Sequence, residues 1–168
     1  MTSLDKIIQD SLESYPLTGM DIINLLKGKT NVMKYNDLEN LALSEILGKH
    51  KACVILYEYP NQEVGHWTAL FEHPDGSLEY FNSFAYGLDY NPSVKTKPIL
   101  ATKLIGYKVI VNTNQLQSKK SDVNTCGRHC VARLAYRHLQ LKDFVKLLTT
   151  NKSYNPDFWS CVLTTIFV

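Results

Sequence analysis

Cys126 lies where a cysteine can act as a nucleophile. The stretch NTCGRHCVARLAYRHL, residues 124–139, begins with turn-forming residues and continues with apolar residues at helical spacing. Cys126 therefore falls in the first turn of a predicted helix, where free backbone N–H groups and the positive end of the helix dipole favour a thiolate. A protonated histidine nearby can lower a cysteine pKa from about 8.5 to about 3.5–7.5. The alternative interpretation is a small apolar residue that caps a helix.

A hairpin turn upstream of the cysteine fixes which strand residues face one another. The turn HPDGS contains Pro74, which has no backbone N–H to donate across a two-residue hairpin. We therefore expect a three-residue loop, with Pro74 at the second position of a type I turn and Gly76 in the left-handed position. His73 then faces Ser77, and this pair sets the register of the whole hairpin.

The same register brings His66 and Asn82 to one face of the hairpin. Thr68 lies opposite Asn82, so His66 and Asn82 are diagonal neighbours with Cα atoms about 7–8 Å apart. A shift of one residue would place them on opposite faces. Asn82 could then orient His66 as a general base with one ring nitrogen free. The alternatives are a strand-edge histidine without chemistry and an asparagine that merely starts a turn.

Gln117 is the candidate for stabilising negative charge on a substrate oxygen. It precedes Cys126 by nine residues, and its side-chain amide could donate to an oxyanion together with the Cys126 N–H. Losing one such donor typically raises a reaction barrier by about 2.7–4 kcal/mol. Gln115 competes with Gln117 for this role, and a solvated loop residue is the alternative interpretation.

A structural zinc site could be assembled from Cys126, Cys130, His129 and His66, because zinc binds such ligands. No second Cys/His pair with ligand spacing accompanies them. We therefore predict neither a metal nor another cofactor, with the zinc domain kept as an alternative.

Composition and charge predict one ordinary globular domain. The chain has 168 residues, of which 45% are hydrophobic and 20% charged, enough to bury a core. A net charge of +2, without a basic stripe, does not require a nucleic-acid partner. No apolar run approaches the roughly 20 residues of a membrane span, and no secretory signal is evident. The four cysteines then indicate a reducing compartment, with Cys53, Cys130 and Cys161 in the core.

The order of the predicted elements is typical of an α+β domain over residues 1–168. Residues 1–48 form a helical part, 51–113 a mainly antiparallel central sheet, and 126–168 a second helical part that starts at Cys126. We expect helices over 2–14, 20–28, 38–47, 127–140 and 141–149, with a last helix capped by Asn155. We expect strands over 51–59, 66–72, 78–84 and 107–113.

The candidate residues follow one another in the order His66–Trp67, Asn82, Gln117 and Cys126–Gly127. This order resembles that of the adenovirus-protease and Ulp1-like cysteine peptidases, clan CE. The segments GHWTALF, YFNSFAYG and QLQSKKSDVNTCGRHCVARL resemble the family's His-Trp strand, its acidic segment and its Gln…Cys-Gly helix opening. With LTGMDIINLL and VMKYNDL added, the chain resembles more narrowly the maturation proteases of virophages and Maverick/Polinton-type elements.

The resemblance implies an adenain/Ulp1-like fold and a cysteine endopeptidase that works through a thioester. Cys126 would be the nucleophile, His66 the acid and base, and Gln117 the oxyanion donor. Substrates would be cut after small residues such as glycine, with Trp67 as the candidate roof of a narrow groove at Gly127. The alternative interpretation of Trp67 is an aromatic side chain that faces the core.

One position departs from the family. Asn82 stands where the family usually has an acidic residue, and an amide can orient imidazole without neutralising imidazolium. A Cys-His-Asn set does work in papain-like enzymes. Asp89 is the alternative third catalytic residue.

The virophage likeness implies a capsid-protein precursor as substrate, cut in the virion or in a viral factory of the host cytoplasm. Adenoviral relatives are activated by a peptide or DNA, which the charge of this chain does not support. The alternatives are a peptidase acting on ubiquitin-like modifiers and a non-catalytic interaction module that keeps the fold.

Overall fold

A five-stranded sheet forms the centre of the structure, a computed structural model that describes residues 2–60, 64–166 and 168. The two inner pairings are antiparallel, whereas each outer strand runs parallel to its neighbour. The sheet is therefore mixed, and the prediction of a mainly antiparallel sheet is wrong at both edges. In order across the sheet, the strands are β1 (Asn31–Lys34), β2 (Ala52–Glu58), β3 (Gly65–Glu72), β4 (Leu78–Phe81) and β5 (Val109–Val111).

Both parallel edges arise from crossover connections, which parallel strands require. Between β1 and β2 the chain forms a 3₁₀ helix, η1 (Tyr35–Asn40), and α3 (Leu43–Leu47); between β4 and β5 it forms α4 (Ile99–Lys103). Strand β1 was not predicted, and η1 with α3 replaces the helix expected over 38–47. Leu41 and Ala42 are extended, and the Ala42 N–H donates to the Glu45 carboxylate at 2.7 Å, so a new helix starts there.

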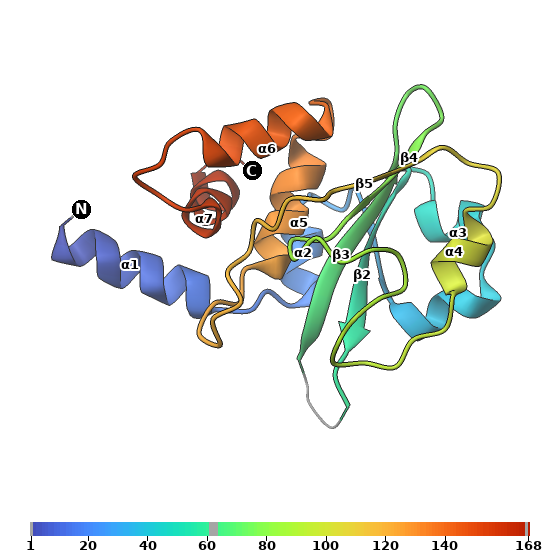
Figure 1. Ribbon diagram of the computed structural model, residues 1–168, viewed down its shortest axis with the longest axis horizontal. Helices are drawn as coiled ribbons and strands as arrows, with labels where there is room; N and C mark the ends of the chain where they lie inside the picture. Colours follow the sequence, from blue (N-terminus) through green and yellow to red (C-terminus); the bar gives the residue numbers. More distant parts are fainter. Residues whose placement is uncertain (1, 61–63, 167) are drawn as a thin grey trace.

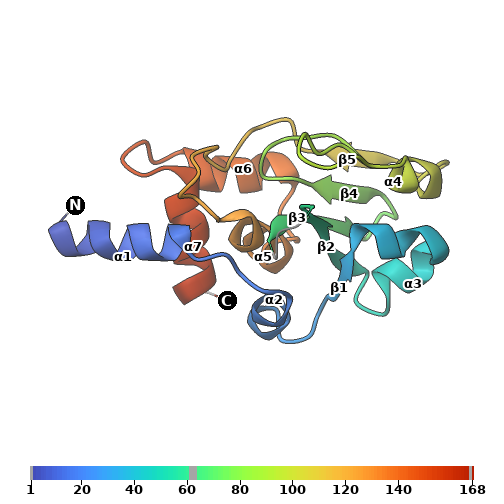
Figure 2. The same ribbon diagram turned by 90° about the horizontal axis from the view of Figure 1, so that it is seen from below.

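Helices cover both faces of the sheet (Figures 1 and 2). One face carries η1, α3 and α4; the other carries α2 (Gly19–Leu25) and α5 (Cys126–Ala135), with α6 (Leu141–Thr149) beside them. The outermost helices are α1 (Ser3–Ser14) and α7 (Pro156–Ile166), and α7 packs on α5. Each face has its own apolar cluster, so the sheet is buried on both sides. The α+β class is confirmed.

The hairpin of β3 and β4 has the predicted register. His73 N–H donates to the Ser77 carbonyl at 2.8 Å, and Gly76 has a φ of 84°. Ala69 pairs with Phe81, which is the register set by the three-residue loop. Strand β4 is shorter than expected, because the chain turns at residue 82 directly after it.

The predicted helices at both ends of the chain are largely confirmed. Thr18 and Asp21 cap α2 reciprocally, and the Asn155 side chain accepts from the Phe158 N–H at 2.8 Å at the start of α7. Helix α5 ends at Ala135, earlier than the expected 140. The expected loop between β2 and β3 includes residues 61–63, which lie outside the described part of the chain.

A buried ion pair fixes α5 against the sheet. Arg133 on α5 donates to both carboxylate oxygens of Glu79 on β4, at 2.7 and 3.0 Å, and both residues are fully buried. Arg133 also donates to the carbonyls of Tyr136 and Leu139 just beyond α5, at 2.9 Å each. Glu79 has a further partner in His73, whose Nε2 lies 2.7 Å from the carboxylate. The helix that carries Cys126 is thus tied to β4.

We expect Arg133→Leu to lower the free energy of unfolding by about 3–5 kcal/mol, because it leaves the Glu79 carboxylate buried without its main partner. Urea denaturation measures the loss. Lys34→Ala is the control: it breaks the exposed 2.9 Å pair with Glu58 and should leave the midpoint nearly unchanged. Equal midpoints for the two variants would contradict the role of the buried pair.

Candidate active site

A cleft of about 390 Å³ lies where β3 approaches the start of α5. It brings together four of the residues predicted from the sequence: Cys126, His66, Trp67 and Gln117. Asn82 lies behind His66, to which it is bonded. The sequence did not indicate the other wall residues, which include Leu17, Tyr59, Val64 and Phe84.

The bond between His66 and Asn82 determines which ring nitrogen can act as a base. Asn82 Oδ1 lies 2.9 Å from His66 Nε2 and 3.0 Å from the Phe84 N–H. Because the Phe84 N–H can only donate, the shared atom must be the amide oxygen, and Nε2 must carry a hydrogen. In the neutral ring, Nδ1 is then the nitrogen with a free lone pair.

Asn82 is itself held by a second asparagine beyond β5. The Asn82 N–H donates to Asn112 Oδ1 at 2.8 Å, and Asn112 Nδ2 donates back to the Asn82 carbonyl at 2.7 Å. Both side chains are buried. Asn112 gave no signal in the sequence, since its role depends on the long-range pairing of β4 with β5.

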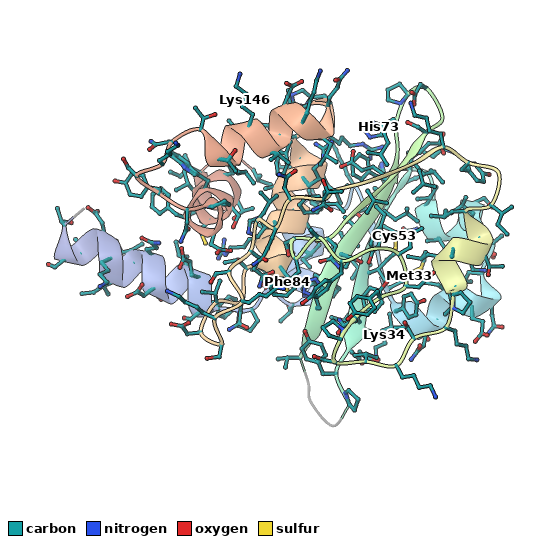
Figure 3. All side chains as sticks on the ribbon, viewed as in Figure 1. Met33, Lys34, Cys53, His73, Phe84 and Lys146 are labelled. Atoms are coloured by element: carbon teal, nitrogen blue, oxygen red, sulfur yellow. The ribbon has the colours of Figure 1, made fainter. Side chains whose placement is uncertain are left out.

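Burial keeps the His66 imidazole neutral. The side chain is only 2% exposed, and Phe84 stacks on its ring with centroids 4.7 Å apart; Figure 3 shows Phe84 between the lower end of α5 and β3. Burial lowers the pKa of His66 to about 4, against the Asn82 bond, which raises it. Since an unfolded histidine has a pKa near 6.5, the neutral ring stabilises the fold above that pH, and this contribution is lost as pH falls toward 4.

Cys126 is the first residue of α5 and is 8% exposed. Burial raises the pKa of its thiol, and the N–H groups of Trp67, Gly127 and Cys126 itself only partly offset this effect. The predicted N–H groups therefore do act on the sulfur, but burial disfavours the resting thiolate that the sequence predicted. Burial thus favours a neutral thiol and a neutral imidazole at rest.

Of the two glutamines, Gln117 lies in the cleft. It is 3% exposed; its Oε1 accepts from the Ser83 hydroxyl at 2.7 Å, and its Nε2 faces the Val123 carbonyl at 3.4 Å. Gln115 is exposed and donates to the Gln117 carbonyl at 2.9 Å. The arrangement gives Gln117 a fixed amide whose N–H₂ group can donate.

Trp67 and Gly127 pack against each other. Trp67 Nε1 donates to the Leu17 carbonyl at 2.9 Å, and the side chain lines the cleft. A Cβ on Gly127 would lie 3.0 Å from Leu17 Cβ and 3.3 Å from Trp67 Cδ1. Gly127 is buried and is not among the residues lining the cleft. In this structure Gly127 allows close packing against Leu17 and Trp67, two residues that line the cleft.

Asp89 lies at another site, in the loop before α4, and its side chain contacts the start of that helix. Its carboxylate accepts from the N–H groups of Leu100 and Ala101, at 2.8 and 2.7 Å, and from the Tyr35 hydroxyl. These bonds occupy both oxygens, and Asn82 is the residue bonded to His66.

The residues of the alternative zinc site do not gather. Over the described ranges, no three His, Cys, Asp or Glu side chains come together as metal ligands. His129 is fully buried and bonds to Asp157 at 3.0 Å. All four cysteines are free and buried.

The chain is similar in sequence to a protein of a virophage. No protein-family model matches the chain. Over 155 residues it is 34% identical to "Uncharacterized protein V9" of Sputnik virophage, an alignment that covers 84% of this chain and 88% of that protein. The chain belongs to the family of this virophage protein. That membership supports a viral origin. None of the described helices has the length and apolar character to cross a membrane.

We expect Asn82→Asp to raise the pKa of His66 from about 4 by roughly 1–3 units, because a carboxylate at this position stabilises imidazolium. NMR titration of the His66 ring protons measures the change. Asp89→Asn, which alters a carboxylate bonded to the start of α4, should leave the titration unchanged. An unchanged His66 pKa in the Asn82 variant would contradict the bond between the two residues.

Proposed function

We propose that this protein is a cysteine endopeptidase that cleaves viral precursor proteins during capsid maturation, after small residues such as glycine. One observation carries the proposal: His66, held by Asn82 behind it, lines the same cleft as Cys126 at the start of a helix, with Gln117 on the wall. A nucleophile, an oriented base and an amide donor in one cleft are the parts that acyl transfer needs.

The reaction begins from the neutral pair. As Cys126 Sγ attacks the scissile carbonyl carbon, His66 Nδ1 takes the thiol proton. The tetrahedral oxyanion accepts hydrogen bonds from the Cys126 N–H and Gln117 Nε2. The resulting imidazolium then protonates the leaving amine, which yields a thioester and the neutral ring. Water, deprotonated by His66, hydrolyses the thioester and restores the thiol.

In these reaction steps Asn82 acts as an orienting residue. Its oxygen holds Nε2–H, so the lone pair of Nδ1 stays available, but its neutral amide stabilises imidazolium too little to offset the effect of burial. The imidazolium therefore forms only transiently, between attack and departure of the amine and again while water hydrolyses the thioester. This assignment agrees with the low pKa that burial gives His66.

The substrate class rests on the walls of the cleft and on the family. Leu17, Tyr59 and Trp67 give the cleft largely apolar, bulky walls, which leave room for a chain with small side chains. The relationship to a virophage protein favours a capsid precursor over a cellular ubiquitin-like conjugate. Cleavage would then take place in the virion or in a viral factory of the host cytoplasm.

We expect Cys126→Ala to abolish cleavage of a virophage capsid precursor co-expressed with the protein, because no other group replaces the sulfur. Intact-mass analysis of the precursor is the measurement, and the thermal midpoint of the variant should stay nearly that of the wild type. Parallel assays on ubiquitin-like fusions test the alternative substrate. Residual cleavage by the variant would place the nucleophile elsewhere.

We expect Gln117→Ala to lower kcat by about 10²–10³-fold with a smaller change in KM, because the amide donates mainly to the transition state. Gln115→Ala is the matched control and should retain the wild-type kcat. If the Gln115 variant carried the larger loss, the oxyanion assignment would be wrong.

A further inference from the structure

Asp157 is a buried carboxylate behind the cleft, in the first turn of α7. It is 1% exposed, and three donors from other parts of the chain converge on it. Its Oδ2 accepts from the Ser118 N–H at 2.9 Å, and its Oδ1 accepts from the Thr125 hydroxyl and from His129 Nε2 at 3.0 Å. The Asp157 side chain therefore connects α7 both to the loop before α5, at Ser118, and to the start of α5, at Thr125 and His129.

The three donors flank the residues assigned to the reaction. Ser118 directly follows Gln117, and Thr125 directly precedes Cys126. His129 lies on the same helix as Cys126, about one turn further on, and is fully buried. Asp157 thus fixes the oxyanion donor and the nucleophile relative to each other, although it does not line the cleft.

The site is built for a charged carboxylate. Burial alone would raise the pKa of Asp157, but the bonds from His129, Thr125 and Ser118 outweigh it, and the net pKa lies below the ordinary value. The start of α7 also favours a negative charge at this position. His129 Nδ1 is buried without a partner in the described structure, so Asp157 supplies the hydrogen bond that orients this ring.

We propose that Asp157 is a positioning residue for the cysteine peptidase reaction, which sets the distance between the Gln117 amide and the Cys126 sulfur. The inference rests on the proposed function, since it concerns the same cleft. It predicts a specific defect: the sulfur stays reactive, but an oxyanion formed beside it is poorly stabilised.

Asp157→Asn tests this idea with little change in shape. An amide offers one acceptor oxygen, so it can keep the bonds to Thr125 and His129 or the bond to Ser118, and its N–H₂ group opposes the remaining donors. Asp89→Asn is a matched control. Like Asp157, Asp89 accepts three hydrogen bonds: from the Ala101 N–H on Oδ2, and from the Leu100 N–H and the Tyr35 hydroxyl on Oδ1. These bonds lie at the start of α4, away from the cleft.

Two rates separate positioning from general damage. Alkylation of Cys126 by iodoacetamide needs the sulfur but forms no oxyanion, whereas cleavage of the capsid precursor needs both. We expect Asp157→Asn to lower kcat for cleavage about 10–100-fold, as misplacement of a catalytic group by about 1 Å can, and to change the alkylation rate less than threefold. Thr125→Val, which removes one donor and keeps the charge, should give a smaller loss of the same kind.

The outcomes are distinct. Asp89→Asn should leave the ratio of the two rates at the wild-type value. If Asp157→Asn lowers both rates in parallel, or neither, Asp157 does not position the oxyanion donor. Should Asp157→Asn fail to fold, an unchanged ratio in Thr125→Val overturns the inference. If wild-type protein cleaves nothing while Cys126 is alkylated normally, the proposed function fails instead.

Discussion

The hydrogen bond from His66 Nε2 to Asn82 Oδ1 is the constraint on which the rest of the site depends. At 2.9 Å, with the Phe84 N–H on the same oxygen, it assigns the ring hydrogen to Nε2 and leaves the lone pair of Nδ1 free in the neutral ring. The bond exists because the β3–β4 hairpin has one register, and because Asn112 holds the asparagine just beyond β4. The orientation of His66 in the cleft thus depends on a turn and on a pair of asparagines.

Burial decides the charge state of the candidate dyad. Both Cys126 and His66 are almost inaccessible to water, so the ion pair familiar from cysteine peptidases is disfavoured at rest. An asparagine in place of an acid fits that state, since a carboxylate would favour imidazolium. The same low exposure strengthens the hydrogen bonds that an oxyanion would receive from Gln117 and the start of α5.

The sequence predicted what local chemistry determines. Pro74 and Gly76 were enough to set the hairpin register, and capping residues located α2 and α7. Strand β1 was missed because four residues paired with a distant strand carry little local signal. The effect of burial on the Cys126 thiol could not be predicted for a related reason: position in a helix is local, but burial is set by the whole fold.

The site was predicted in outline rather than in full. Cys126, His66, Asn82 and Gln117 could be found because their types and order are chemically suggestive. Asp157 could not, since a single aspartate at a helix start is ordinary until three donors from distant segments meet on it.

Trapping the acyl-enzyme tests the central claim most directly. Protein mixed with a virophage capsid precursor would be quenched in acid within a turnover and digested, and its cysteine-containing peptides analysed by mass spectrometry. The account predicts an acyl mass on Cys126 that disappears on treatment with hydroxylamine. Precursor cleavage with Cys126 unmodified at every time point, or with the adduct on Cys53, Cys130 or Cys161, would contradict it.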